Sequence, residues 1–392
     1  MKLLYVKKIN VAIILVGVKD ISGGGGAERF WSDIVRLNES NQINYKFLID
    51  RETYNSLKSV NRLSEDKTKI ILISNNPKNR LQLYFYWIEI YIKLIINRIK
   101  IIHVGFYSAN YYKILKFLSI FSRLKISITI VSCFTAYCFI DSKYEGIYKM
   151  KYRFKDVFNN IQLSGVLCWY NKFKEVAIEQ KIIKSNPYIY PVKHCFTDLT
   201  NYKPNKEKLN EIIFASRLEA IKRPELFLEL IKVLINRYDK EVVSRWNFII
   251  YGNGSLKNKL ISFAQKNKLN KYIEFRESFD LSNVFPSSKI FVSTQELENF
   301  TSLSMLEAMS CGNAIIAFDV GQTDYFIKHS VNGYLSADKN MNAMAEDIYK
   351  LMTMKDEKLI QMQKASINIV KNVHTKNNFI SELDKYFIDI IS

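Results

Sequence analysis

The chain contains few cysteines that could cross-link its fold through disulfides or a structural metal. Its 392 residues include only five cysteines, an odd number with no Cys-x-x-Cys pair and no metal-ligand spacing: Cys133, Cys138, Cys168, Cys195 and Cys311. Neither a disulfide framework nor a structural zinc site is indicated, and a reducing cytoplasm is the simplest environment. We predict no metal site in this chain.

Proline and glycine are also scarce, at 6 and 13 residues. No low-complexity segment or internal repeat interrupts a composition that is 48% hydrophobic and 24% charged. This excludes a disordered chain or a repeat array. A globular chain of this length exceeds one ordinary core and fits two domains of roughly 150 to 200 residues.

Uninterrupted apolar runs of about 20 residues, which a membrane-spanning helix needs, are missing. Residues 11–18 follow lysines as in a signal peptide, but the run is short and leads into a glycine loop, so a first β-strand is favoured. Residues 81–99 and 111–125 combine apolar and aromatic residues with a few charges. They predict two helices that either rest on a membrane surface or pack against the sheet of the first domain.

Acidic residues are in short supply only in the first half of the chain. Residues 1–200 contain 31 Lys+Arg against 15 Asp+Glu, a net charge of +16. Residues 201–392 contain 26 against 23, a net charge of +3, and together they make the total of +19. The basic half predicts an anionic partner: nucleic acid, an acidic membrane face or a phosphorylated acceptor.

Apolar β-branched runs alternate with helical patterns along both halves, which is typical of doubly wound parallel sheets. Strand candidates are residues 11–17, 45–49, 69–73, 101–104, 126–131 and 165–169, then 212–216, 248–251, 273–275, 290–293 and 314–318. Both periodicities break at residues 190–204. We expect Rossmann-like α/β domains at residues 1–195 and 196–375, and a terminal helix at 376–392 that packs back on the first domain. Ligands of such sheets bind at the carboxyl ends of the strands, which predicts a site between the domains.

The most informative segment is FVSTQELENFTSLSMLEAMSCGNAIIAF, residues 291–318. It predicts a strand, a polar loop, a short helix that begins at Thr301 and Ser302 and ends before Gly312, and another strand. The N–H groups at such a helix start favour an anion. At about 1.5 Å per residue, Glu307 lies roughly 7 Å along the helix from Ser302. That spacing could hold a phosphate and a hydroxyl of the attached sugar, and it predicts a nucleotide sugar.

Three further loops follow strand candidates. GGGGAER, residues 23–29, could form an anion nest or a flexible turn. IIFASRLEAIKRP, residues 212–224, places Arg217 and Lys222 on one loop, where they suit a diphosphate or form a solvated pair. YGNGS, residues 251–255, could border the nucleotide or be a plain left-handed turn, with Ser255 expected as a helix N-cap.

Read together, SRLEAIKRPELFLE, YGNGSLKNKL and ELENFTSLSMLEAMSCGNAIIAFDVG resemble the nucleotide-sugar domain of the retaining glycosyltransferases of family 4. GGGGAERF and CFTD resemble the same family, so the similarity spans nearly the whole chain. The resemblance implies the GT-B fold, two Rossmann-like domains facing each other across a cleft. It also implies transfer from a UDP- or GDP-sugar without a metal or other cofactor, with the donor chiefly on the second domain and the acceptor chiefly on the first.

Carried over position by position, Arg217 and Lys222 match the family's diphosphate-binding pair, and Glu307 matches the glutamate that accepts the ribose hydroxyls. The family usually has seven residues between two glutamates, whereas here Asn299 stands eight before Glu307 and Glu298 one residue further off. Either Asn299 or Glu298 would contact the transferred sugar, and both join Arg217 and Lys222 as candidate catalytic residues. The remaining candidate donor-binding residues are Gly24, Gly25, Gly26, Gly252, Asn253, Thr301, Ser302 and Leu303.

The family's first-domain histidine near the reacting sugar has no clear counterpart, and we interpret His103 as structural. No carboxylate pair is placed as in glycosidases, so no covalent intermediate is expected. Instead, Arg217, Lys222 and the helix start near Ser302 would hold the developing diphosphate charge.

The favoured function is a hexosyltransferase-type enzyme that elongates a cell-surface polysaccharide such as capsule, lipopolysaccharide or exopolysaccharide. Its acceptor would be a polyprenyl-diphosphate-linked saccharide at an anionic membrane surface, which predicts a cytoplasmic enzyme peripheral to the inner membrane face. Nucleic acid is not expected as a partner. The alternatives are a nucleotide-sugar epimerase of the same fold and a basic nucleic-acid- or membrane-binding protein without catalysis.

Overall fold

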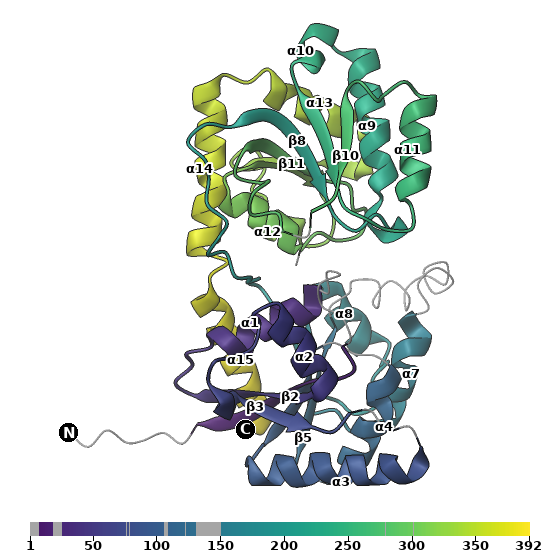
Figure 1. The fold of residues 1–392 in the computed structure, drawn as a ribbon, viewed down its shortest axis with the longest axis vertical. Helices are drawn as coiled ribbons and strands as arrows, with labels where there is room; N and C mark the ends of the chain where they lie inside the picture. The colour runs from purple at the N-terminus through teal and green to yellow at the C-terminus, as the bar shows by residue number, and fades with distance from the viewer. Residues whose placement is uncertain are drawn as a thin grey trace, which may run out of the picture. The chain divides into compact units, whose positions relative to one another are not determined.

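The computed structural model describes residues 8–18, 26–75, 77, 79–105, 109–121, 123–130, 150–278, 280–300 and 302–392. The chain divides into two compact units. Unit 1 comprises Met1–Lys193 together with Lys376–Ser392, and unit 2 comprises His194–Thr375. The beginning and the end of the chain, purple and yellow in Figure 1, therefore belong to the same unit.

Unit 1 is built on a parallel sheet with the strand order β3-β2-β1-β4-β5-β6-β7 in the part of the chain that the structure describes. Its strands are β1 (Ile9–Leu15), β2 (Ile43–Asp50), β3 (Ile70–Ile73), β4 (Ile101–Val104), β5 (Lys125–Ile130), β6 (Gly165–Cys168) and β7 (Tyr188–Pro191). Its helices are α1 (Gly26–Leu37), α2 (Arg51–Ser59), α3 (Arg80–Ile96), α4 (Ala109–Leu118), α7 (Met150–Asn160), α8 (Asn171–Glu179) and α15 (Lys376–Ile391), with a short 3-10 turn η1 (Lys67–Lys69). Residues 11–15 of β1 are fully or almost fully buried, as expected of a central strand that is covered on both faces.

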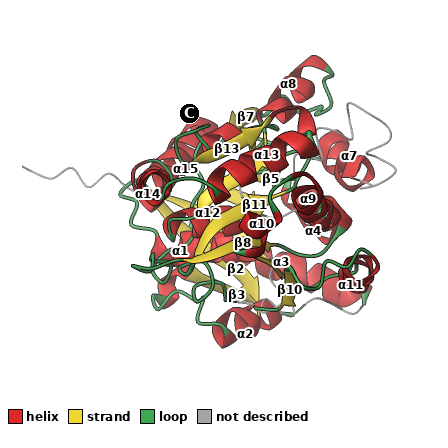
Figure 2. Ribbon diagram, turned by 90° about the horizontal axis from the view of Figure 1, so that it is seen from above, coloured by secondary structure: helices red, strands yellow, loops and turns green. Residues whose placement is uncertain are grey.

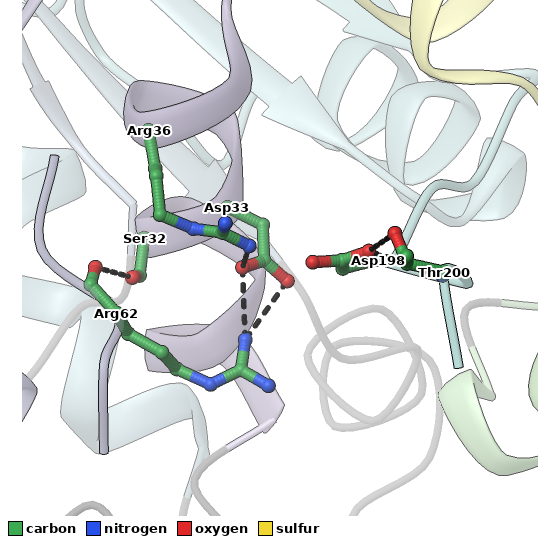
Figure 3. Close-up of polar contacts among 6 residues, drawn as sticks. All are labelled: Ser32, Asp33, Arg36, Arg62, Asp198 and Thr200. Carbon is green, nitrogen blue, oxygen red and sulfur yellow. Dashed lines mark hydrogen bonds and ion pairs between the residues drawn. The ribbon is translucent and has the colours of Figure 1, made fainter. Parts of the chain in front are cut away.

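Helix α1 is held to its unit by a buried carboxylate. Asp33 is fully buried and accepts two hydrogen bonds from Arg62, at 2.8 and 2.9 Å, and a third from Arg36 at 3.1 Å (Figure 3). Ser32 on the same helix donates to the Arg62 carbonyl at 2.6 Å. Both Arg62 hydrogen bonds come from Nη1, one to each carboxylate oxygen, and the guanidinium compensates the buried charge.

The terminal helix α15 packs into unit 1 through one apolar face. Its buried apolar residues recur with helical spacing and are Phe379, Ile380, Leu383, Tyr386, Phe387 and Ile390. Asp384, on the same helix, accepts hydrogen bonds from Ser40 at 2.5 Å and from the Tyr45 hydroxyl at 2.9 Å. These contacts tie the last helix of the chain to β2 and to the residues just before it.

Unit 2 has a second parallel sheet, which in the described residues has the order β10-β9-β8-β11-β12-β13. The strands are β8 (Leu209–Ala215), β9 (Asn247–Tyr251), β10 (Ile273–Arg276), β11 (Ser288–Ser293), β12 (Ala314–Phe318) and β13 (Gly333–Ser336). The helices are α9 (Pro224–Arg237), α10 (Lys240–Ser244), α11 (Lys257–Lys266), α12 (Leu303–Ser310), α13 (Met341–Met352) and α14 (Asp356–Asn372), with 3-10 turns η2 (Ala220–Lys222), η3 (Thr323–Tyr325) and η4 (Ala337–Lys339). In both units, strands (yellow in Figure 2) alternate along the chain with helices (red).

The predicted α/β architecture with two parallel sheets is confirmed. Nearly all expected strands appear within a few residues of their predicted bounds, and residues 101–104 and 314–318 coincide with β4 and β12. Strands β7 and β13 were not predicted, and the last two residues of β7 overlap the segment we expected to break the pattern at residues 190–204. Both are four-residue strands at a sheet edge, where only one side pairs and a continuous apolar run is not required.

Among the described residues, no helix has the length and apolar character that crossing a membrane requires. The helix predicted at 81–99 appears as α3, which ends at Ile96, and the helix predicted at 111–125 appears as α4, which ends at Leu118. The two helices pack side by side through stacked rings, Trp87 on Phe117 and Tyr91 on Phe121. Both helices belong to unit 1.

Candidate active site

The loop between β8 and α9 carries the two predicted diphosphate ligands. Arg217 comes two residues after the strand and is exposed, whereas Lys222 ends η2 and is half-buried. Arg223 then adopts a left-handed φ of 51°, and Pro224 starts α9. Because proline has a fixed φ and needs no helical N–H partner, it suits this first position.

The glycines of YGNGS allow the β9 loop to pack directly on the β8 loop. A Cβ atom on Gly252 would lie 2.0 Å from the Ser216 carbonyl oxygen, and one on Gly254 would lie 2.6 Å from the Leu218 carbonyl oxygen. Leu218 also donates its N–H to the Asn253 carbonyl at 2.9 Å. Only glycine permits this approach, so the two glycines position the loop that carries Arg217.

The polar side chains of the same loop face neighbouring loops of unit 2. The Asn253 amide donates to Glu277 at 3.4 Å. Ser255 donates from its N–H and its hydroxyl to Glu219, at 2.9 and 2.7 Å, and these bonds lower the pKa of Glu219. The prediction that Ser255 caps the next helix is wrong, because Leu256 occupies the N-cap of α11 and Glu219 takes the Ser255 hydroxyl.

A chain of hydrogen bonds connects Lys222 with the polar loop after β11. Lys222 Nζ donates to Gln295 Oε1 at 2.9 Å, and Gln295 Nε2 donates to Asn299 Oδ1 at 3.2 Å. Ser293 donates to the same Asn299 oxygen at 2.5 Å, and Asn299 Nδ2 donates to the Thr323 hydroxyl at 3.3 Å. Asn299 is only 1% exposed. Its buried amide links Ser293 of β11 to Thr323 in the loop after β12.

Glu298 has a different partner set, made of backbone N–H groups. Its carboxylate accepts from Asn299 at 2.8 Å, from Phe300 at 2.7 Å and from Gln322 at 2.9 Å. A Cβ on Gly321, whose φ is 55°, would lie 2.1 Å from this carboxylate. Burial raises the Glu298 pKa to about 7, although the backbone donors act in the opposite direction. Glu298 therefore clamps two loops together.

Helix α12 follows this clamp and has the predicted caps. Ser302 is the N-cap, and its hydroxyl accepts from Met305 N–H at 3.4 Å. Gly312, at φ 71°, follows the helix in the left-handed conformation that commonly ends a helix. Leu303 begins the helix, and Glu307 lies on its buried side with 3% exposure.

A small cavity lies where these loops meet, at the carboxyl ends of β8 and β11. It brings together Lys222 and Ser302, two of the predicted donor ligands, with Gln295 and further polar groups that the sequence interpretation did not single out. Its polar lining residues are Ser216, Lys222, Ser293, Gln295, Ser302 and Ser304. The sequence marks these residues in only one way. They lie at or just after the carboxyl ends of β8 and β11, or at the start of α12.

The structure does not bring every predicted residue to this cavity. Arg217, Gly252, Asn253, Glu298 and Glu307 lie on the surrounding loops and helix but do not line it.

Some predicted donor-binding residues lie at the margin of what the structure describes. Gly24, Gly25 and Thr301 lie outside the described residues, and Gly26 is the first residue of α1. Glu296, on the same loop as Glu298, pairs with Arg223.

The CFTD motif opens unit 2. Cys195 donates its N–H to Nδ1 of His374, at the other end of the unit, at 3.3 Å. Asp198 accepts the Thr200 hydroxyl at 2.6 Å and so closes a local turn (Figure 3). These contacts give the motif a structural role within the unit.

His103 lies in the middle of β4 and is completely buried. Its two ring nitrogens pair with the hydroxyls of Ser127, at 2.8 Å, and Thr129, at 2.7 Å. Burial lowers the His103 pKa to about 3, so the ring is neutral at physiological pH. Its surroundings are those of a structural residue.

Residues 197–368, nearly all of unit 2, match the family model of the glycosyl transferases group 1. A poly(ribitol-phosphate) alpha-N-acetylglucosaminyltransferase of Staphylococcus aureus is 31% identical over 166 residues, which are 41% of this chain and 32% of that protein. The GtfA subunit of a UDP-N-acetylglucosamine–peptide N-acetylglucosaminyltransferase of Streptococcus agalactiae is 28% identical over 188 residues, 45% of this chain and 36% of that protein. The chain thus spans about a third of the length of the curated relatives it matches.

Solved structures resemble the whole chain. HepE of Anabaena, in complex with UDP and glucose, has a TM-score of 0.70 at 14% identity and covers 97% of this chain and 100% of its own. TarM of Staphylococcus aureus, in complex with UDP and fondaparinux, has a TM-score of 0.68 at 15% identity, covering 97% and 99%. The pneumococcal O-GlcNAc transferase GtfA, in complex with UDP and GlcNAc, has a TM-score of 0.66 at 13% identity, covering 98% and 99%.

The structural similarities show a shared fold, and the family match concerns unit 2. They support the predicted enzyme class. Residues 197–368 therefore match the glycosyl transferases group 1 model, in a chain that has the GT-B fold.

Proposed function

We propose that the protein is a glycosyltransferase that takes its sugar from a UDP-sugar, with UDP-N-acetylglucosamine as the first donor to test. The observation that carries the proposal is the meeting of Lys222 and the Ser302 start of α12 in one cavity, within the segment that matches the group 1 model. Two relatives of this segment are named N-acetylglucosaminyltransferases, and several structures of similar fold hold UDP. A cation and the N–H groups at a helix start suit the diphosphate of such a donor.

The proposed chemistry is retaining transfer without a metal. As the bond between the sugar and the diphosphate breaks, negative charge develops on the leaving group, and Lys222, Arg217 and the start of α12 stabilise it. Asn299 and Glu298 are the candidates for contact with the transferred sugar, and Glu307 for the ribose. Because hydrogen bonds already orient the Asn299 amide, it would act as a fixed group, whereas Glu298 would need to leave its three backbone donors.

The proposed acceptor is a polyprenyl-diphosphate-linked saccharide at the inner face of the cell membrane, used to build a cell-surface polysaccharide. The support is the net charge of +16 in residues 1–200, which suits an anionic acceptor and an anionic surface. The names of the relatives point to two other acceptor classes, poly(ribitol phosphate) and peptide. All three belong in one acceptor panel.

The decisive experiment incubates the purified protein with UDP-N-acetylglucosamine, UDP-glucose and GDP-mannose, with each acceptor class and with or without a chelator. We expect release of UDP, dependent on one donor and one acceptor and unchanged by the chelator, and an α-linked product from an α-linked donor by NMR. Inversion at the anomeric carbon or loss of activity with the chelator would refute those parts of the mechanism. Conversion of the nucleotide sugar to an epimer without UDP release would favour the epimerase alternative.

A further inference from the structure

Helix α3 of unit 1 has an exposed face made entirely of large apolar side chains. One face is buried through Tyr86, Ile90 and Leu94, which anchor the helix to its unit. On the opposite side, seven large apolar residues are between 48% and 70% exposed. The four in the first half of the helix are Leu81, Tyr84, Phe85 and Ile88, and the three in the second half are Ile92, Ile95 and Ile96.

These seven residues form one continuous stripe. Their spacing of three, four or one residues returns them to the same side of a helix with 3.6 residues per turn. The described residues contain 15 exposed large apolar side chains, and nearly half of them lie on this 17-residue helix. The others are dispersed over both units, as expected of an ordinary surface.

The surroundings of the stripe are strongly basic. Residues 80–125 contain eight Lys+Arg and a single acidic residue, Glu89, so the segment carries a net charge of +7. Glu89 is already paired with Lys93 at 2.7 Å. Exposed cations stand at both ends of α3 and on α4, which packs beside it: Arg80, Arg98, Lys100, Lys113 and Lys116.

We propose that α3 is a membrane-docking helix that lies in the headgroup region of an anionic bilayer, with its stripe inserted and the flanking cations on the lipid phosphates. The combination of an apolar face, interfacial aromatics and a basic border is that of a helix lying in a membrane surface. A second copy of the chain would be a poor occupant, because two such borders of +7 would face each other and repel. An anionic lipid surface instead complements the charge.

Vesicle co-sedimentation tests this inference without using catalysis. The wild-type protein is expected to bind phosphatidylethanolamine–phosphatidylglycerol vesicles, and to bind pure phosphatidylcholine vesicles much more weakly. The double variant Ile88→Ser with Ile92→Ser should bind at least about tenfold more weakly, because two inserted aliphatic side chains are lost. The control is Ile178→Ser, an exposed isoleucine on α8 of the same unit, which should bind as the wild type does.

Charge variants test the second half of the inference. Lys113→Gln and Lys116→Gln should each weaken binding by about fivefold, an effect that added salt removes. Equal binding by the Ile88→Ser and Ile92→Ser variant would overturn the proposal, and so would equal binding to both lipid mixtures. A wild-type dimer in solution that this variant converts to monomers would overturn it too, by making the stripe a protein interface.

The inference does not depend on the proposed transfer reaction. A thermal shift with UDP reports the unit 2 site independently, and the α3 variants should leave it unchanged. Loss of vesicle binding with intact UDP binding therefore concerns α3 alone, whereas vesicle binding without any UDP response would count against the proposed function only.

Discussion

The two units bury polar side chains in different places. In unit 1 one group lies inside the sheet, where His103 of β4 contacts Ser127 and Thr129 of β5, and Ser127 also contacts the Tyr386 hydroxyl of α15 at 2.5 Å. In unit 2 one group lies instead at the carboxyl ends of the strands, with Glu298 and Asn299 as its centre. The unit 2 core beneath is a large cluster of apolar residues.

Buried hydrogen bonds therefore have different roles in the two units. Hydrogen bonds in the unit 1 core fix where a distant helix docks, because an unpaired polar group there would be costly. Those at the strand ends of unit 2 fix loops that would otherwise be mobile, and so orient groups around a cavity. Disrupting unit 1 should therefore change stability, while disrupting the unit 2 loops should change activity.

The largest expected effect is on the docking of α15. Phe387 is fully buried between Tyr45 and His103, so Phe387→Ala should destabilise unit 1 by roughly 3 to 5 kcal/mol. Hydrogen exchange in urea, analysed by peptide, should show early unfolding of unit 1 with unit 2 unchanged. Ile391→Ala, at the exposed end of the same helix, serves as the control. Equal losses in both units would show that they do not unfold separately.

The next effect is on catalysis at the unit 2 cavity. Lys222→Ala should lower kcat by about 10² to 10³, because one charge-stabilising donor to the leaving group is lost, and Arg217→Ala should act in the same direction. The measurement is UDP release under saturating donor, with the free energy of unfolding determined in parallel. Lys232→Ala, an exposed lysine of α9, is the control. Near-normal rates in both site variants would rule out the proposed role of the pair.

A smaller effect concerns the pH dependence of the Glu298 clamp. Burial raises the Glu298 pKa from 4.5 to about 7, so the folded state holds this proton more tightly than the unfolded state. The resulting stabilisation is complete below about pH 4.5 and is lost as pH rises through about 7. Between about pH 5 and pH 8, the wild type should lose on the order of 2 to 3 kcal/mol of unfolding free energy relative to Glu298→Gln. If the unfolding free energies of the two proteins changed with pH in the same way, the raised pKa of buried Glu298 would be contradicted.

The smallest effect tests how Lys222 is positioned. Gln295→Leu removes the hydrogen bond to Lys222 and the one to Asn299, and should lower kcat about tenfold while hardly changing the free energy of unfolding. Gln295→Glu keeps an acceptor for Lys222 and should recover part of the rate if support of the lysine matters most. Gln265→Leu, at an exposed position of α11, is the control. A loss of stability without a change in kcat would make Gln295 part of the scaffold.

Much of this arrangement could be predicted because it depends on local sequence. Alternating apolar runs predict parallel strands, and the caps of α12 follow from Ser302 and Gly312, whose preferences act within one turn of the helix. The loop carrying Arg217 and Lys222 could be located because it follows a strongly apolar strand. Lys222 and Ser302 reach one cavity because the carboxyl ends of adjacent parallel strands lie at one edge of a sheet.

Features that depend on distant partners were not predictable. Ser255 looks like a helix cap, but Glu219, far along the chain, accepts its hydroxyl. The edge strands β7 and β13 have too little apolar sequence to stand out, and they form because a neighbouring strand is already in place. Gln295 resembles any polar loop residue until folding brings it to Lys222.

The sequence by itself determined the two parallel sheets, the order of the loops and the residue types at the strand ends, because strand and helix patterns and capping act over a few residues. Only the tertiary structure decided that Glu298 turns to backbone donors while Asn299 joins the chain of hydrogen bonds from Lys222. It also decided which side of α3 is buried, since an apolar pattern all around a helix does not say which face packs. These outcomes depend on contacts between residues far apart in the chain, which local preferences do not contain.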